Sequence, residues 1–405
     1  MQYLPNKNFN SILIGIIIVL LVAMGQFNNT LFIPSLPHMS APLGASDSFL
    51  QLSVTLTLFA FGISQLIYGP LSDYYGRRPI VLIGLIIFLF GNFICFLATS
   101  GVVFLIGKVI TGLGVGCVGP IARSIARDLS SGKNLLKLMG ILVMFMSIFP
   151  AISPMIGGAI QGYFGWKMNF ITLFIISSIF IIFLYLMLPE TNENIKLKDN
   201  IFNFSKMIRN YCELLLNGEF LRMALFNMFG YAAELVFLLS SSYVLQEHFH
   251  MSPQKFGLIP IIIVPCVMVG NFIVTKLSSR FNVYTICTIG ISLILFGSVL
   301  MFFFSEIMPS KVISFIIPMM VVALGEGIVT PCSTARCMDL YGKKAGYAGA
   351  AVGAIAMLGA GIIIGISSVN PLNNLFNISI ALLLISCTLV ILCFINWIFQ
   401  KKEIL

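Results

Sequence analysis

Three ionisable side chains lie inside long stretches that are otherwise almost wholly apolar: Lys108, Glu234 and Glu326. At the centre of a lipid bilayer each would cost about 2.5–3.5 kcal/mol on insertion scales, so we expect each to face water or a partner. Desolvation there favours the neutral form of a carboxyl group, which suits a group that binds and releases protons. We interpret Glu234 or Glu326 as a proton carrier and Lys108 as a modulating cation or anion-binding group. The alternative is a buried Lys–Glu pair that only locks the fold.

The fourth, seventh and tenth apolar stretches carry Lys108, Glu234 and Glu326, whereas the first carries uncharged polar residues. Polar side chains therefore fall on the first, fourth, seventh and tenth stretches, and we expect these four to surround a polar cavity. Aromatic residues near it offer walls for a lipophilic or cationic solute, although packing against lipid would explain most of the 36 phenylalanines equally well. The expected cavity residues are Gln26, Asn28, Asn29, Thr30 and Tyr231.

The stretches that hold these residues have the length of membrane-crossing helices. Of the 405 residues, 59% are hydrophobic and 9% are charged, against about 25% charged in soluble domains. The apolar runs are about 20 residues long, as a bilayer helix requires, and they lack the alternation of a β-barrel. The predicted spans are 11–35, 48–70, 79–98, 102–126, 138–160, 168–188, 220–245, 256–277, 284–304, 313–335, 347–368 and 375–399.

The distribution of lysine and arginine orients these spans. Nineteen of the 23 cations fall on one side, among them Lys7, Lys133, Lys137, Lys196, Lys198, Lys343, Lys401 and Lys402; three fall on the other, Lys167, Lys255 and Lys311. The positive-inside rule then puts both termini in the cytosol. This bias explains the net charge of +9 without a nucleic-acid partner. The nine cysteines show no CxxC or Cys/His cluster, so we expect neither disulfides nor a metal site.

One long polar stretch divides the chain into residues 1–188, a linker 189–219 and residues 220–405. The linker holds Glu190, Glu193 and Asp199, then an apolar stripe that predicts an amphipathic helix on the membrane surface. That stripe consists of Ile201, Phe204, Ile208, Tyr211 and Leu215. The two halves also share a pattern at an offset of 211 residues: Gly114, Gly116, Pro120 and Asp128 recur as Gly325, Gly327, Pro331 and Asp339. We infer two related six-helix bundles, an arrangement found in many secondary transporters.

The loop between the second and third spans contains Gly69, Asp73, Gly76, Arg77 and Arg78. Asp73 precedes Arg77 by four residues, so the two can pair on one face if the loop is helical. The carboxylate could also cap the N-terminus of a neighbouring helix, and the glycines would let helix ends approach closely. Topology-setting charge alone would explain the arginines but neither the aspartate nor the glycines.

This loop resembles the corresponding loop of the major facilitator superfamily. Other segments are similar to its twelve-span drug:proton antiporters, closest to the Bcr/CflA group, and the likeness extends from about residue 12 to 400. These segments are Phe32–Pro37, Ile125–Leu129 and Ala151–Gly158. The chain departs from the group at Thr30, where an acidic residue is usual, at Lys108, where arginine is usual, and in the degenerate second-half loop 276–282.

The resemblance implies the fold and two gating elements. The fold is an all-α integral membrane protein with twelve transmembrane helices in two six-helix pseudo-repeats. The loop motif would be a cytosolic latch that holds the halves together when the site opens outward. The fifth span, with Pro150, Pro154, Gly157 and Gly158, would seal the halves on one side; ordinary helix packing explains these residues equally well.

These features predict a secondary active transporter in a bacterial inner membrane. We expect proton-coupled efflux of a drug-like or metabolite small molecule by a monomer, with the proton gradient as energy source and no cofactor. No P-loop pattern is present, so ATP is not the direct energy source. The alternatives are an exporter or importer of a specific endogenous solute such as a siderophore, and a non-transporting receptor on the same fold. No HExxH or GxSxG motif points to an enzyme.

Overall fold

The computed structural model describes residues 11–130, 132–192, 204–369 and 374–404, and within these ranges it contains helices and no strands. Twelve helical segments are long and apolar enough to cross a membrane, which confirms the predicted fold class. The elements are α1 (Ser11–Thr30), η1 (Ile33–His38), α2 (Ser40–Leu43), α3 (Asp47–Tyr75), α4 (Arg77–Leu97), α5 (Gly101–Val115), α6 (Val118–Leu129), α7 (Gly132–Phe164), α8 (Lys167–Met187), α9 (Phe204–Leu216), α10 (Gly218–Tyr243), η3 (Val244–His248), α11 (Pro253–Leu277), α12 (Val283–Ile307), α13 (Ile313–Asp339), η4 (Gly342–Lys344), α14 (Ala345–Val369) and α15 (Leu375–Ile404).

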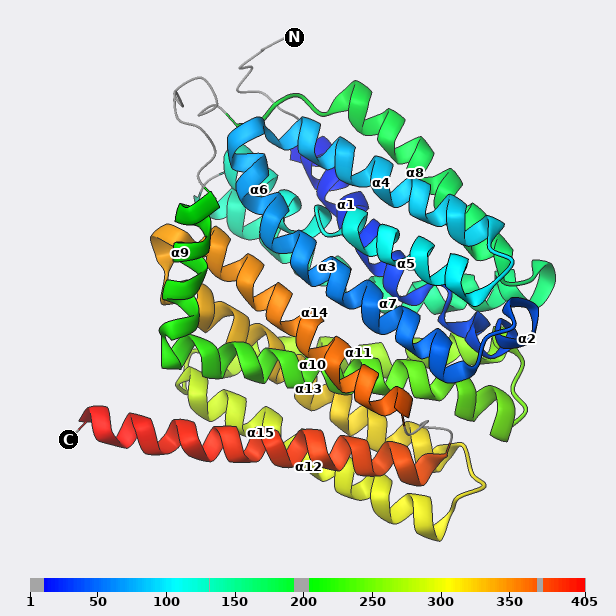
Figure 1. The fold of residues 1–405 in the computed structure, drawn as a ribbon. Coiled ribbons are helices and arrows are strands. Elements are labelled where there is room, and N and C mark those ends of the chain that lie inside the picture. Colours follow the sequence, from blue (N-terminus) through cyan, green and yellow to red (C-terminus); the bar gives the residue numbers. More distant parts are fainter. Residues whose placement is uncertain (1–10, 131, 193–203, 370–373, 405) are drawn as a thin grey trace.

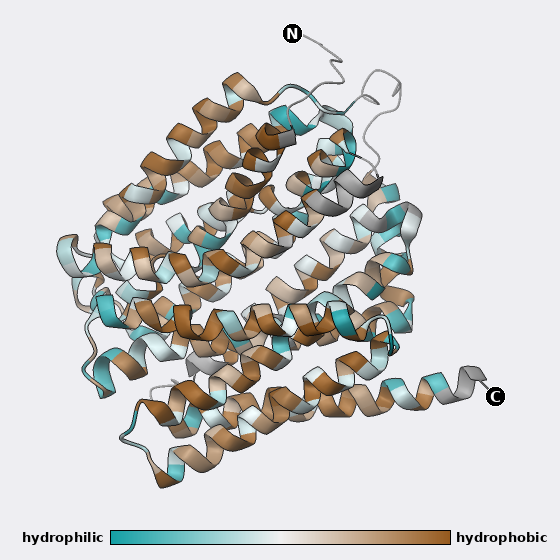
Figure 2. Cartoon of the chain, turned by 180° about the vertical axis from the view of Figure 1, so that it is seen from behind, coloured by the Kyte–Doolittle hydropathy of each residue, from teal (hydrophilic) through white to brown (hydrophobic). Residues whose placement is uncertain are grey.

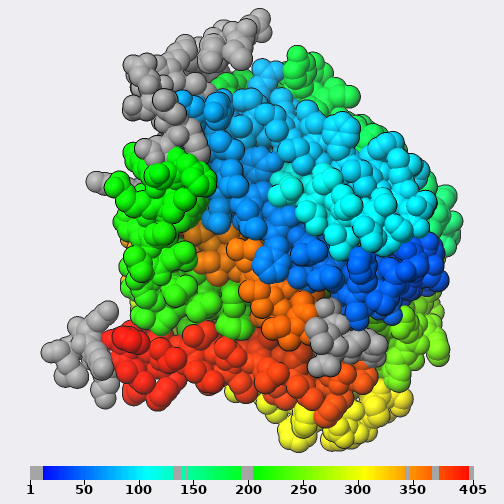
Figure 3. All heavy atoms as spheres, in the orientation of Figure 1, coloured from blue at the N-terminus to red at the C-terminus, as the bar shows by residue number. Residues whose placement is uncertain are grey.

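The helices form two bundles, α1 to α8 and α10 to α15, that lie side by side (Figure 1). The bundles meet chiefly through two helix pairs, α3 with α14 and α7 with α11. The space-filling view shows α3, in blue, against α14, in orange (Figure 3). We call the side where α9 lies the linker face and the side where η1 and α2 lie the opposite face (Figure 1). Any polar site in the middle of the molecule is therefore enclosed by both bundles.

The sequence repeat at an offset of 211 residues has a packing explanation. A Cβ at Gly114 would collide with the backbone of α4, and one at Gly325 would collide with the backbone of α12. A Cβ at Gly116 would likewise meet α3, and one at Gly327 would meet α11. Each bundle thus uses the first glycine against its third span and the second glycine against its second span. The two halves are pseudo-repeats in structure as well as in sequence.

The outward surfaces of the peripheral helices are apolar. In α8, Ile175, Ile179 and Ile182 are 51%, 63% and 60% exposed, and apolar residues dominate the outer helices in the hydropathy view (Figure 2). Polar residues cap several helix starts instead: the Ser46 and Ser100 hydroxyls accept hydrogen bonds from backbone amides three residues later. Capped, water-compatible ends and apolar middles are what a bilayer demands of a helix.

The structure differs from the sequence-based expectation in two elements. The fourth span is divided into α5 and α6 at Gly116–Cys117, although one continuous span was expected. In the linker, Tyr211 was assigned to a stripe facing the membrane, but its hydroxyl donates a hydrogen bond of 2.9 Å to the Leu66 carbonyl of α3. The helix α9 therefore docks on the protein, because the Tyr211 side chain finds an acceptor there.

Several residues used in the sequence argument lie outside the described residues. They are Lys7, Glu193, Lys196, Lys198, Asp199 and Ile201. The side chains of Lys133, Lys137, Lys343, Lys401 and Lys402 are also outside the described part. The orientation inferred from lysine and arginine remains a prediction.

Candidate functional site

The two intramembrane glutamates lie together between α10 and α13, near the junction with the first bundle. Glu234 projects from α10 and Glu326 from α13, and their carboxyl groups are within hydrogen-bonding range of each other. Glu326 is 5% exposed, and its Oε2 atom has no hydrogen-bond partner. Two adjacent carboxyl groups with little access to water cannot both be ionised without a large cost. Such a pair is chemically able to take up and release a proton.

Polar residues of the first span connect this carboxyl pair to the other bundle. The Tyr231 side chain, one turn before Glu234, lies beside the Asn29 side chain of α1. Asn28 Nδ2 in turn donates to Asn29 Oδ1 at 3.1 Å. Asn28 Oδ1 is buried and has no hydrogen-bond partner. The chain of contacts spans the junction of the two bundles and leaves acceptor atoms free for a solute, a proton or water.

Lys108 continues this chain into the fourth span. Its ammonium nitrogen lies 3.3 Å from the Asn28 carbonyl oxygen and 3.9 Å from the centre of the Phe32 ring. The residue is 2% exposed, and no carboxylate of the described residues lies within ion-pairing distance of it. In this conformation the cation is held by a carbonyl dipole and an aromatic face, and the alternative of a locked Lys–Glu pair is not what the structure contains.

The centre of the molecule is closed in this conformation. The cavity beside Lys108 and Asn29 has a volume of about 10 Å³, which holds roughly one water molecule. Leu235 and Leu239 of α10 line it together with residues of α3 and η1. A solute could reach this site only if the two bundles separate on one side.

The structure brings Asn28, Asn29 and Tyr231 into the site but not all expected cavity residues. The Thr30 hydroxyl donates to the Gln26 backbone carbonyl within α1 at 2.8 Å, so Thr30 is satisfied along its own helix. Phe32 was not predicted as a contact of Lys108. Phe32 follows the end of α1 at Thr30, and its contact with Lys108 had no clear signal in the sequence.

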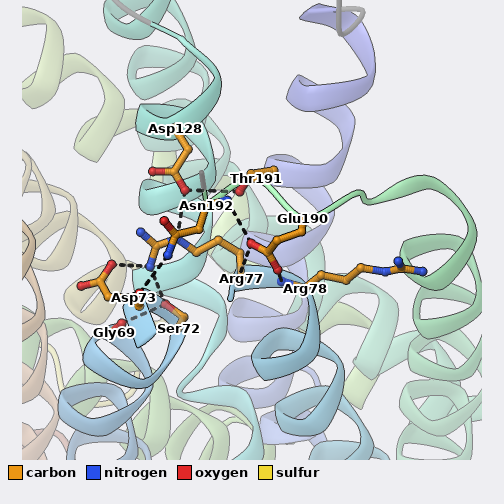
Figure 4. A network of polar contacts seen from close by, with 9 residues as sticks. All are labelled: Gly69, Ser72, Asp73, Arg77, Arg78, Asp128, Glu190, Thr191 and Asn192. Carbon is orange, nitrogen blue, oxygen red and sulfur yellow. Dashed lines mark hydrogen bonds and ion pairs between the residues drawn. The ribbon is translucent and has the colours of Figure 1, made fainter. Parts of the chain in front are cut away.

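A second polar network lies at the linker face and is centred on Arg77 (Figure 4). Arg77 pairs with Asp73 at 2.5 Å and with Asp128 at 2.9 Å, and it donates to Ser72 Oγ at 2.7 Å. The Arg77 side chain is 7% exposed, so these contacts are largely sheltered. The predicted pair of Asp73 and Arg77 is present, and Asp128 adds a third helix, α6, to the network.

The Asp73–Arg77 pair does not form along one continuous helix. The helix α3 ends at Tyr75, and Gly76 has φ of +106°, which only glycine adopts without strain. Gly69 does not act as expected, because a Cβ there would meet Pro120 only at an ordinary 3.8 Å. The turn therefore requires a glycine at position 76.

Glu190, read from the sequence only as a charge of the linker, has a defined contact in the structure. Its carboxylate accepts hydrogen bonds from the backbone amides of Arg77 at 2.9 Å and Arg78 at 3.2 Å. These amides are the free donors at the start of α4, where a negative charge is favourable. Arg78 itself points away and donates to the Tyr185 carbonyl at 2.6 Å. Glu190 therefore ties the segment after α8 to the loop motif (Figure 4).

Tyr211 of α9 joins both bundles at the linker face. Its acceptor, the Leu66 carbonyl, lies four residues before Pro70, and Pro70 has no N–H to occupy it. The ring also packs edge-on against Tyr347 of α14 at 5.2 Å. Burial raises the pKa of Tyr211 well above its usual range, with contributions from Tyr347 and Asp73, so the hydroxyl stays a donor. Pro70 was the signal in the sequence that could have revealed this contact.

The second bundle has its own ionic cluster near the linker face. Arg336 of α13 pairs with Glu219 of α10 at 2.8 Å and with Asp339 at 3.2 Å. Tyr284 of α12 also donates to Glu219. Arg336 therefore joins three helices of its bundle, as Arg77 does in the first.

The fifth span lies at the interface between the bundles. Pro150 and Pro154 are inside the helix α7. A Cβ at Gly157 would collide with the Leu31 carbonyl oxygen, and one at Gly158 would collide with the Pro253 carbonyl oxygen of α11. The two glycines permit close contact with the first span and with the other bundle, respectively.

Comparison with known proteins agrees with this architecture. The chain is 25% identical over 389 residues to multidrug resistance protein D of Escherichia coli (strain K12), with 96% of each chain covered. It is 26% identical over 357 residues to the uncharacterized MFS-type transporter YdgK of Bacillus subtilis (strain 168), with 87% of each covered. The crystal structure of a D-xylose-proton symporter superposes with a TM-score of 0.74 at 15% identity, covering 93% of this chain and 97% of that one. The model of the Major Facilitator Superfamily matches residues 18–367, and the chain belongs to this superfamily of membrane transporters.

Proposed function

We propose that this transporter exports a small, drug-like or metabolite solute in exchange for protons. The observation that carries the proposal is the pair Glu234–Glu326, buried between α10 and α13 and connected through Tyr231 and Asn29 to the first bundle. The relationship to multidrug resistance protein D supports the assignment of a drug-like solute. The conserved architecture of the superfamily supports transport by alternating access of two bundles.

The proton on the carboxyl pair would be the coupling element. When the pair carries one negative charge, it attracts a cationic or hydrogen-bonding solute to the junction of the bundles. When a second proton binds, the charge disappears and the solute loses its partner, so proton uptake and solute release are linked. The cation of Lys108 near Asn28 would favour the deprotonated pair or bind an anionic part of the solute.

The remaining features of the proposal concern location and partners. The lysine and arginine bias supports a linker face in the cytosol, and the bacterial relatives support a location in a bacterial inner membrane. The expected partners are the solute, protons and lipid. We propose a monomer that uses the proton gradient alone and needs no cofactor or metal.

The test is transport by the purified protein in proteoliposomes with an imposed pH gradient and a cationic dye. If one proton exchanges for one solute, each pH unit supports an accumulation of about tenfold, since one pH unit equals about 1.36 kcal/mol. Replacing Glu326→Gln keeps the size of the side chain and removes its ionisation. We expect gradient-driven accumulation to fall to about onefold while solute counterflow continues.

The matched control is Glu306→Gln, an exposed glutamate at the end of α12, which should leave accumulation unchanged. Retention of full proton coupling by both Glu326→Gln and Glu234→Gln would refute the carboxyl pair as the coupling element. Binding of solute without counterflow in the wild-type protein would instead identify a receptor.

A further inference from the structure

A cavity of about 80 Å³ lies between the two bundles at the linker face. This volume is several times the roughly 10–15 Å³ that one buried water needs, and about half that of a cavity able to hold benzene. Residues of both bundles and of α9 form its walls. They are Gly69, Pro70, Asp73, Arg77, Pro120, Arg123, Ser124, Arg127, Asp128, Tyr211, Met338, Gly346, Tyr347 and Ala350.

The walls carry positive charge that the protein does not neutralise. Of the three arginines, Arg77 is engaged by both aspartates, Asp73 and Asp128. Arg123 and Arg127 have no carboxylate within ion-pairing distance among the described residues. The Nη2 atom of Arg123 is buried and makes no hydrogen bond. A buried guanidinium N–H without an acceptor is costly, so this site lacks a negatively charged or polar group.

A helix N-terminus adds to the same positive potential. The 25-residue helix α14 begins at Ala345, and both arginines lie against its first turns. A Cβ at Gly346 would be 3.5 Å from Arg127 Nη1, and one at Gly349 would be 3.8 Å from Arg123 Nε. The helix dipole disfavours a cation at the N-terminus, whereas it stabilises an anion there.

We propose that this cavity is a binding site for a small oxyanion, held by Arg123, Arg127 and the N-terminus of α14. The planar guanidinium group suits phosphate or carboxylate oxygens, and backbone amides of a helix start complete such sites. The anion would contact α6 of the first bundle and α14 of the second at once. Its binding therefore stabilises the arrangement in which the bundles are joined at the linker face.

The test measures binding of inorganic phosphate to the full chain in nanodiscs of pure phosphatidylcholine, by calorimetric titration at constant ionic strength. The wild-type protein is expected to bind, and Arg123→Gln to bind about tenfold or more weakly, since the substitution removes a charge-assisted hydrogen bond to the anion. Arg127→Gln should weaken binding about two- to fivefold because this side chain is exposed. The control Arg280→Gln, in the exposed loop after α11, should bind like the wild type.

A second arm distinguishes a free anion from a lipid headgroup. The apparent melting temperature is compared in nanodiscs of phosphatidylcholine and of phosphatidylcholine mixed with phosphatidylglycerol, without added phosphate. Stabilisation by phosphatidylglycerol that is lost in Arg123→Gln assigns the site to a headgroup, whereas binding in phosphatidylcholine assigns it to a soluble oxyanion. The proposal is overturned if the wild-type protein shows neither phosphate binding nor stabilisation by phosphatidylglycerol. It is also overturned if Arg123→Gln shows these effects to the same extent as the wild type. If Arg123→Gln fails to fold, the exposed Arg127→Gln decides in the same way.

Discussion

Replacing Arg77→Gln should destabilise the first bundle more than any other single charge change at the linker face. The substitution removes a guanidinium that is 7% exposed and leaves two carboxylates without their cation. Asp128 is 19% exposed and Asp73 is 47% exposed. The unpaired charge on Asp128 therefore dominates the cost, because water can solvate Asp73 more readily.

The expected loss follows from these exposures. Breaking a fully buried pair costs about 3–5 kcal/mol, and an exposed pair contributes about 0.2–1 kcal/mol. The Arg77 network is between these limits, so we expect a loss of roughly 3 kcal/mol. For a unit the size of one bundle this corresponds to a fall in melting temperature of about 6–12 °C.

The assay is thermal unfolding of the purified protein in detergent, with Arg78→Gln as the matched control. Arg78 is the neighbouring cation, and its side chain makes only a partly exposed contact with Tyr185, so its loss should cost less than about 1 kcal/mol. Adding Asp128→Asn to Arg77→Gln removes the unpaired charge and should restore at least half of the lost stability. Equal effects of the two arginine variants, or a further loss in the double variant, would refute the reasoning.

Two further substitutions test helix packing and the linker contact. Gly114→Ala places a methyl group against the backbone of α4 and should cost about 1–3 kcal/mol, seen as a lower melting temperature, whereas Gly15→Ala, with open space around it, should have no such effect. Tyr211→Phe removes the hydroxyl that reaches α3 and should cost about 1 kcal/mol; faster hydrogen exchange in α9 would report it, and unchanged exchange would contradict a docking role.

Hydropathy predicts the twelve spans well because the bilayer itself imposes their length and composition. The deep charges Lys108, Glu234 and Glu326 are recognisable for the same reason, since each is expensive where it stands. The sequence does not reveal that the two glutamates contact each other while Lys108 contacts Phe32. Those contacts depend on the rotation of each helix about its axis, which packing between helices sets. Close approach at Gly157, by contrast, agrees with the small-residue rule for membrane helices.

Local chemistry explains the other differences. The break between α5 and α6 follows two glycines whose partner helices demand close contact, and a hydropathy profile does not register it. Glu190 looked like one of several linker charges, yet its position after α8 brings it to the free amides of α4. Both features depend on neighbours that are distant in the chain.

The two ionic clusters, around Arg77 in one bundle and Arg336 in the other, lie near the same face. Each joins three helices of its own bundle. Ionic contacts that join three helices at one end of a bundle resist relative movement of those helices. The bundle can therefore move as one rigid body. If transport proceeds by alternating access as proposed, the opening motion would be a rocking of two stiff bundles against each other along the pairs α3–α14 and α7–α11. Because each bundle is stiff at the linker face, a small shift of α10 and α13 at the carboxyl pair would produce a larger displacement at the surface.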